Sequence, residues 1–158
     1  MKVRKQTLWR VPVYCLIASW LSFYVTVYLG RFFFVVTTVG EDGVVVGSID
    51  QVRSGIFNGV LFLIVLLLGG LWAFRSMTRA EIAVSAGIMT VLYLILVGLQ
   101  LALPQFPTSL IFPVATIQHW SGALTSLLLK VTGQLTVSAI LACLAPLLFI
   151  PFGRKQVQ

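Results

Sequence analysis

Acidic side chains are almost absent from this sequence. Asp and Glu together number 4 among 158 residues, and all charged residues make up 9% of the chain, whereas soluble domains carry about 25%. A soluble fold needs a charged shell, yet 59% of these residues are apolar. The composition therefore excludes an ordinary soluble domain and indicates an integral membrane protein.

Cysteine and histidine are also scarce. Cys15 and Cys143 lie far apart inside apolar segments, without the spacing of a disulfide framework or a metal site. His119 is the single histidine, so a metal has no nearby partner ligands and a bis-histidine haem would need two chains. No nucleophile elbow, phosphate loop or HExxH motif occurs. We expect no metal and no cofactor, assign no catalytic residue, and favour a non-enzymatic protein over an enzyme.

Four apolar stretches are each long enough to cross a hydrocarbon core of about 30 Å, which takes about 20 helical residues. They are residues 11–30, 56–74, 82–103 and 131–152, separated outside by loops 31–55 and 104–130. The predicted fold class is all-α, a polytopic four-helix transmembrane bundle forming one domain over residues 1–158. Thr78-Arg-Ala-Glu81 has the spacing of a capping box for the third helix, and Ser48-Ile-Asp-Gln51 has it for a lead-in to the second.

The formal charge of +7 comes from basic residues at the ends of these stretches. They form no basic patch interleaved with aromatics, so we expect no nucleic-acid partner. The positive-inside rule counts Lys and Arg in short loops. One side holds Lys2, Arg4, Lys5, Arg10, Arg75, Arg79, Arg154 and Lys155, and the other holds Arg31, Arg53 and Lys130. The asymmetry predicts a multi-pass protein of the cell membrane with both termini in the cytoplasm.

Both outer loops have distinctive composition. β-branched and aromatic runs at residues 32–39 and 44–49 flank Asp42-Gly43, a strong two-residue hairpin signal, so we expect a small extracytoplasmic β-hairpin. The alternative is that residues 32–36 extend the first helix. The second loop is too apolar for a solvated loop and is interrupted by prolines; we expect a short interfacial helix or re-entrant turn, with His119 and Trp120 at headgroup level.

Polar residues near the outer ends of the spans form the candidate binding site: Asn58, Gln100, Lys130 and Gln134. Ser126, Lys130, Gln134 and Ser138 recur every four residues and would form a stripe on a continuous fourth helix. On such a helix Lys130 lies about 12 Å from the bilayer centre, at about 1.5 Å per residue. It is then either an interfacial anchor that snorkels to the headgroups or part of an outward-facing polar pocket.

Small residues also recur four apart, at Gly55 and Gly59, Ala83 and Gly87, Gly98 and Ala102, and Ser138 and Ala142. This spacing favours close helix packing, in a bundle or in an oligomer.

Three functions remain open from the sequence. The leading one is a small accessory protein or complex subunit that binds other membrane components: lipids, another membrane protein or a second copy of itself. The alternative is a small homo-oligomeric transporter or channel with a polar site in the outer leaflet. The third is a membrane-embedded enzyme acting on lipids, which is least supported because no general acid or base is evident.

Overall fold

The computed structural model describes residues 7–39, 45–103 and 107–154. The chain is mostly helical, with four helices long and apolar enough to span a membrane and one two-stranded sheet. The candidate spans are Arg10–Phe33, Gln51–Ala73, Arg79–Ala102 and Leu135–Phe152. They overlap all four apolar stretches expected from the sequence.

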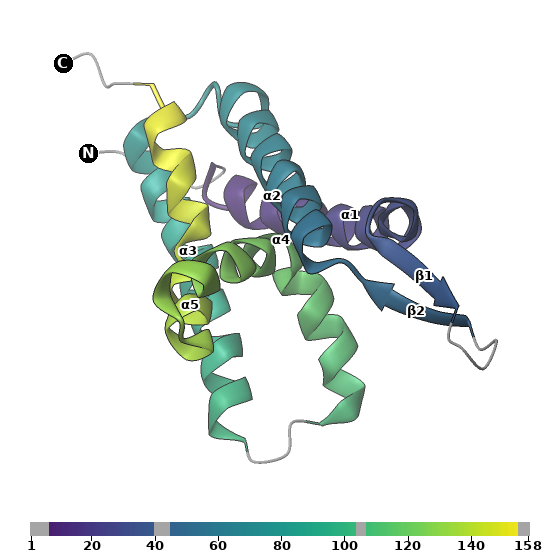
Figure 1. Ribbon diagram of the computed structural model, residues 1–158. Coiled ribbons are helices and arrows are strands. Elements are labelled where there is room, and N and C mark those ends of the chain that lie inside the picture. Colours follow the sequence, from purple (N-terminus) through teal and green to yellow (C-terminus); the bar gives the residue numbers. More distant parts are fainter. Residues whose placement is uncertain (1–6, 40–44, 104–106, 155–158) are drawn as a thin grey trace.

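Each span is built from one or two helical elements (Figure 1). The first and third are the single helices α1 (Arg10–Phe33) and α3 (Arg79–Ala102). The second joins α2 (Gln51–Leu68) to the π-helical turn η2 (Gly69–Ala73), and the fourth joins α5 (Leu135–Ala142) to the 3-10 helix η3 (Ala145–Phe152). Proline lacks a backbone N–H, so Pro146 and Pro151 disfavour regular α-helix in η3.

The hairpin strands are confirmed. β1 (Val35–Val39) pairs antiparallel with β2 (Val45–Ile49), in a register that places Val35 opposite Ile49 and Val39 opposite Val45. The predicted Asp42-Gly43 turn lies outside the described residues. The alternative, that residues 32–36 extend the first helix, was also correct in part. α1 includes residues 32 and 33 and ends at Phe33, before the chain enters β1.

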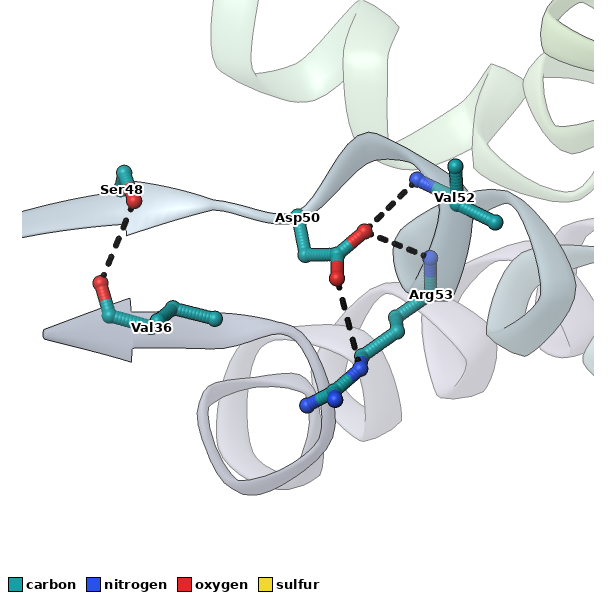
Figure 2. Close-up of polar contacts among 5 residues, drawn as sticks. All are labelled: Val36, Ser48, Asp50, Val52 and Arg53. Carbon is teal, nitrogen blue, oxygen red and sulfur yellow. Dashed lines mark hydrogen bonds and ion pairs between the residues drawn. The ribbon is translucent and has the colours of Figure 1, made fainter.

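The helix caps match the sequence at one of two positions. The Thr78 hydroxyl accepts from the Glu81 N–H at 3.3 Å, and the Thr78 N–H donates to the Glu81 carboxylate at 3.0 Å, so the capping box is confirmed. The predicted Ser48 cap was wrong. Ser48 lies in β2 and donates to the Val36 carbonyl at 3.3 Å, whereas Asp50 caps α2 (Figure 2).

Asp50 takes this role because its short carboxylate reaches the free N–H groups of the first turn. One oxygen accepts from the backbone N–H groups of Val52 and Arg53 at 2.9 and 3.1 Å, and the other lies 3.3 Å from the Arg53 Nε (Figure 2). The cap also fixes the junction between the hairpin and α2, since the Asp50 N–H donates to the Phe34 carbonyl at 2.8 Å.

The second outer loop differs most from expectation. In place of a short helix or re-entrant turn, residues Thr108–Thr132 form α4, a helix of 25 residues with Pro113 inside it. α4 runs from the lower right of Figure 1 into the middle of the bundle, and it packs on α1, α2 and α5. Pro113 is in the second turn of this helix, where its missing N–H removes one intrahelical hydrogen bond, the one to the Ser109 carbonyl.

Trp120 is therefore a core residue, and its expected place at headgroup level was wrong. Its side chain is 1% exposed and stacks between Phe62 and Phe149, with ring centroids 5.1 and 5.4 Å away. The indole N–H donates to the Phe62 carbonyl at 3.4 Å. One aromatic stack thus joins α2, α4 and η3.

A continuous fourth helix is also absent. Gly133 ends α4 with a left-handed φ of 67°, a conformation that glycine adopts without steric cost. Gln134 is extended, and α5 begins at Leu135. Ser126 and Lys130 therefore belong to α4 and Ser138 to α5, so the predicted polar stripe is broken and its depth estimate does not apply.

The small-residue pairs divide into two groups. A Cβ added at Gly55 would lie 3.5 Å from the Lys130 Nζ, and one at Gly59 would lie 3.8 Å from Leu127, so this pair faces α4 closely. A Cβ added at Gly87 or Gly98 meets nothing within 4 Å. At Gly55 and Gly59 the neighbours are side chains of α4 at ordinary van der Waals distance, so the structure shows α4 side chains packed over this pair.

Candidate functional site

A cavity of about 390 Å³ is lined by polar and small residues of α2, α3 and α4. Asn58 projects from α2 and Gln100 from α3, and the remaining wall comes from α4. The α4 residues recur three or four apart, which places them on one helical face. They are Ala115, Gln118, His119, Gly122, Ala123 and Ser126.

Hydrogen bonds connect the cavity to α1. The His119 Nε2 lies 3.0 Å from the Thr26 hydroxyl, and that hydroxyl donates to the Asn58 side-chain oxygen at 3.5 Å. The Asn58 amide in turn donates to Ser54 one turn earlier on α2, at 3.4 Å. His119, Thr26, Asn58 and Ser54 thus form one chain of polar contacts that joins α4, α1 and α2.

Packing holds the imidazole in this orientation. The edge of the Phe23 ring meets His119 at a centroid distance of 5.5 Å and an interplanar angle of 85°. Phe23 also packs edge-on against Phe112, earlier on α4. His119 is thus fixed from α1 by one hydrogen bond and one ring contact, and it is a wall of the cavity in place of the headgroup anchor expected from the sequence.

Two polar atoms here are buried without a hydrogen-bond partner. The Gln118 Nε2 belongs to a lining residue of the cavity, and the Ser22 Oγ borders a small void behind it with Asn58 and His119. Leaving a buried donor unsatisfied costs about 1 to 3 kcal/mol. The region beside the cavity therefore holds two polar atoms whose burial is costly in the structure as it stands.

A second cavity of about 520 Å³ adjoins the first and shares Asn58 and Ser126 with it. Lys130 lies in its wall, together with Gln51, Ser54 and Gly55 from the first turns of α2. The ammonium sits over α2, 3.5 Å from the position of a Cβ on Gly55. Among the described residues Lys130 has no ion pair or hydrogen bond. The carboxylate of Asp50, at the start of α2, pairs with Arg53.

The structure brings three of the four predicted site residues together. Asn58 lines both cavities, Gln100 lines the first and Lys130 lines the second. Gln134 lines neither cavity; it is exposed at the break after α4, where its carbonyl accepts from the hydroxyls of Thr132 and Ser138. Its separation follows from the left-handed Gly133, which turns the chain away from the direction of α4.

Sequence reasoning missed Gln118 as a site residue and placed His119 elsewhere. The signal was present, because residues 115, 118, 119, 122, 123 and 126 have helical spacing. It was hidden because the prolines of residues 104–113 favoured a loop. Recognising a helix across Pro113 would have placed these residues on one face.

The chain matches no family model, no curated protein and no solved structure in the comparisons. The geometry of the two cavities therefore carries the functional argument.

The chemistry of the first cavity is that of neutral hydrogen bonding. Its polar lining consists of three carboxamides, one imidazole and one hydroxyl, from Asn58, Gln100, Gln118, His119 and Ser126. Such groups recognise hydroxyl, carbonyl or amide functions, since each offers a donor or an acceptor without charge. The second cavity adds one positive charge at Lys130. Together they place neutral hydrogen-bonding groups next to one positive charge.

Proposed function

We propose that this chain is a multi-pass protein of the cell membrane that works without catalysis, by binding other membrane components. The observation that carries the proposal is the pair of adjoining polar cavities between α2, α3 and α4, with the buried Gln118 Nε2 left without a partner. Polar groups inside an apolar bundle are costly, and they commonly mark binding sites or pathways. A bound component would use the hydrogen-bonding capacity that the protein itself leaves unused.

In this proposal both termini face the cytoplasm. Support comes from the way basic residues gather at one end of the bundle. The Arg10 guanidinium donates to Ser76 at 2.9 Å, and the Arg154 N–H donates to the Met77 carbonyl at 3.0 Å, so the start of α1, the start of α3 and the end of η3 adjoin. Arg53 lies at the other end of α2, beside the hairpin. This grouping is the one that the positive-inside rule assigns to the cytoplasm.

The orientation is tested with two matched serines, both exposed in the structure. In intact cells, Ser48→Cys in β2 is expected to react with a membrane-impermeant thiol reagent, whereas Ser76→Cys reacts only after the membrane is opened. The native Cys15 and Cys143 are buried and provide a low background. Labelling of Ser76→Cys alone from outside would reverse the orientation, and labelling of both in intact cells would show that the span Gln51–Ala73 does not cross the membrane.

The binding function is tested by purifying the chain in mild detergent and measuring the mass of the particle by native mass spectrometry. We expect a bound component, lipid or a different chain, that is released on denaturation. Recovery of the bare 17.4 kDa chain would contradict the proposal. A symmetric homo-oligomer that carries no other component would instead favour the transporter hypothesis, because several copies can line a path.

A further inference from the structure

The wall around Lys130 combines a charge with exposed apolar side chains. The ammonium faces the cavity over Gly55, and the same cavity is bordered by Ile49 and Val52, which are 62% and 63% exposed. Leu127 and Leu129 of α4 border it on the other side and are also exposed. A small anion in water has no use for such a wall. A molecule with an anionic group next to hydrocarbon satisfies both features.

Electrostatics at this point favour an anion. The single acid near Lys130 in the described chain, Asp50, is already engaged by Arg53 and by the two backbone N–H groups that it caps. Lys130 stands in the last turn of α4, where the free carbonyl groups give only a partial negative charge. No described carboxylate forms an ion pair with its ammonium, and a phosphate would supply that pair.

The neutral cavity is continuous with the one at Lys130, because Asn58 and Ser126 line both. Asn58 follows Gly55 by three residues, which is about 4.5 Å along the axis of α2 at about 1.5 Å per residue. From there the first cavity continues to Gln118 and His119. Its carboxamides and imidazole suit hydroxyl groups, which can both accept and donate. A choline headgroup offers no hydroxyl, and its fixed positive charge would be repelled by Lys130.

We propose that the two adjoining cavities bind the headgroup of an anionic phospholipid that carries free hydroxyls, with its phosphate at Lys130 and its hydroxyls at Asn58, Gln118 and His119. The inference rests on the proposed binding function and names its ligand class. The volumes of about 390 and 520 Å³ fall within the range of ordinary ligand pockets, about 300 to 1,000 Å³. The acyl chains would lie along the exposed apolar side chains beside Lys130.

The test titrates the purified full chain with phosphatidylglycerol, phosphatidylcholine and phosphatidic acid in detergent, with bound lipid counted by native mass spectrometry. Wild type is expected to prefer phosphatidylglycerol. Lys130→Gln should weaken that binding about 10- to 100-fold, the loss typical of a charge-assisted hydrogen bond, while Lys130→Arg keeps most of it. Arg31→Gln is the matched control, since Arg31 is exposed, lies over the Phe32 ring and lines neither cavity.

A second variant separates the headgroup site from simple charge attraction. Gln118→Met keeps the volume and removes the unpartnered amide, so it should weaken phosphatidylglycerol binding and leave phosphatidic acid, which has no headgroup hydroxyl, unchanged. Equal losses in Lys130→Gln and Arg31→Gln would overturn the inference in favour of surface charge. Displacement of the lipid by millimolar inorganic phosphate would overturn it in favour of a small-anion site.

The failure of this inference differs from failure of the proposed function. If the purified chain carries a partner chain or a neutral lipid but shows no preference for phosphatidylglycerol, the headgroup assignment is lost and the binding function stands. If it carries nothing and binds none of the three lipids, both are lost.

Discussion

Replacing Trp120 with alanine is expected to lower the free energy of unfolding by about 3 to 5 kcal/mol, the cost of deleting a large buried aromatic side chain. The indole is 1% exposed, stacks on Phe62 and Phe149 and donates to the Phe62 carbonyl. Between apolar helices in lipid, stability depends on such packing and hydrogen bonding, because lipid chains are as apolar as the core itself. The deletion would therefore leave a cavity where three elements meet. The measurement is a denaturation curve in detergent.

Trp72→Ala is the matched control for this prediction. Trp72 is 83% exposed in η2, so its loss removes the same side chain without opening a core cavity. We expect a change of about 0.5 kcal/mol or less, as for ordinary surface substitutions. An equal loss of stability in both variants would show that Trp120 is not the centre of the packing between α2, α4 and η3.

Replacing Gly153 with alanine is expected to destabilise the end of the bundle where the starts of α1 and α3 adjoin. A Cβ there would lie 2.7 Å from both the Cα and the N of Arg79, which are backbone atoms at the start of α3. Backbone cannot move aside as a flexible side chain can, and forced overpacking typically costs about 1 to 3 kcal/mol. We expect a loss near the upper end of that range, measured as a lower melting temperature in detergent.

The close approach at Gly153 is tied to specific hydrogen bonds. The Arg79 guanidinium donates to the Gly153 carbonyl at 3.2 Å, and the Arg79 N–H donates to the Arg154 carbonyl at 3.2 Å. A Cβ would push these groups apart and release η3 from α3. Gly87→Ala in α3 is the control. A Cβ on residue 87 meets nothing within 4 Å, and alanine favours a helix over glycine by about 1 kcal/mol. A Gly153→Ala variant as stable as Gly87→Ala would contradict the packing at this end.

The two stability predictions also bear on the binding site. Trp120 follows His119 directly, so the same turn of α4 places one side chain in the core and the next in the polar cavity. Trp120→Ala is expected to disturb His119 as well, whereas Gly153→Ala acts at the start of α3, far along the chain from Gln100. Lipid binding measured on both variants would therefore fall in the first and persist in folded molecules of the second.

Features that depend on a few consecutive residues could be predicted from the sequence. The four apolar stretches correspond to helices because hydropathy over about 20 residues is a local property. The Thr78 capping box and the paired strands of the hairpin also depend on neighbouring residues alone. The Ser48 cap failed within this same class, because Asp50 offers a stronger acceptor two residues later and β2 retains Ser48.

The position of α4 and the shape of the cavities were decided by tertiary structure. Whether residues 108–132 lie at an interface or inside the bundle depends on the helix faces of α1, α2 and η3 that contact them. Trp120 is buried because its ring packs against Phe62 of α2 and Phe149 of η3. The hydrogen bond between Thr26 and His119 joins residues 93 apart in the chain. Gly133 could have ended a helix or continued one, since it lies within the apolar stretch 131–152; in the structure its left-handed conformation separates Gln134 from Lys130. Composition and local hydrogen bonding therefore determined which segments of this chain are helices, while contacts between distant helices determined which polar groups meet, because only those contacts bring the groups within hydrogen-bonding distance.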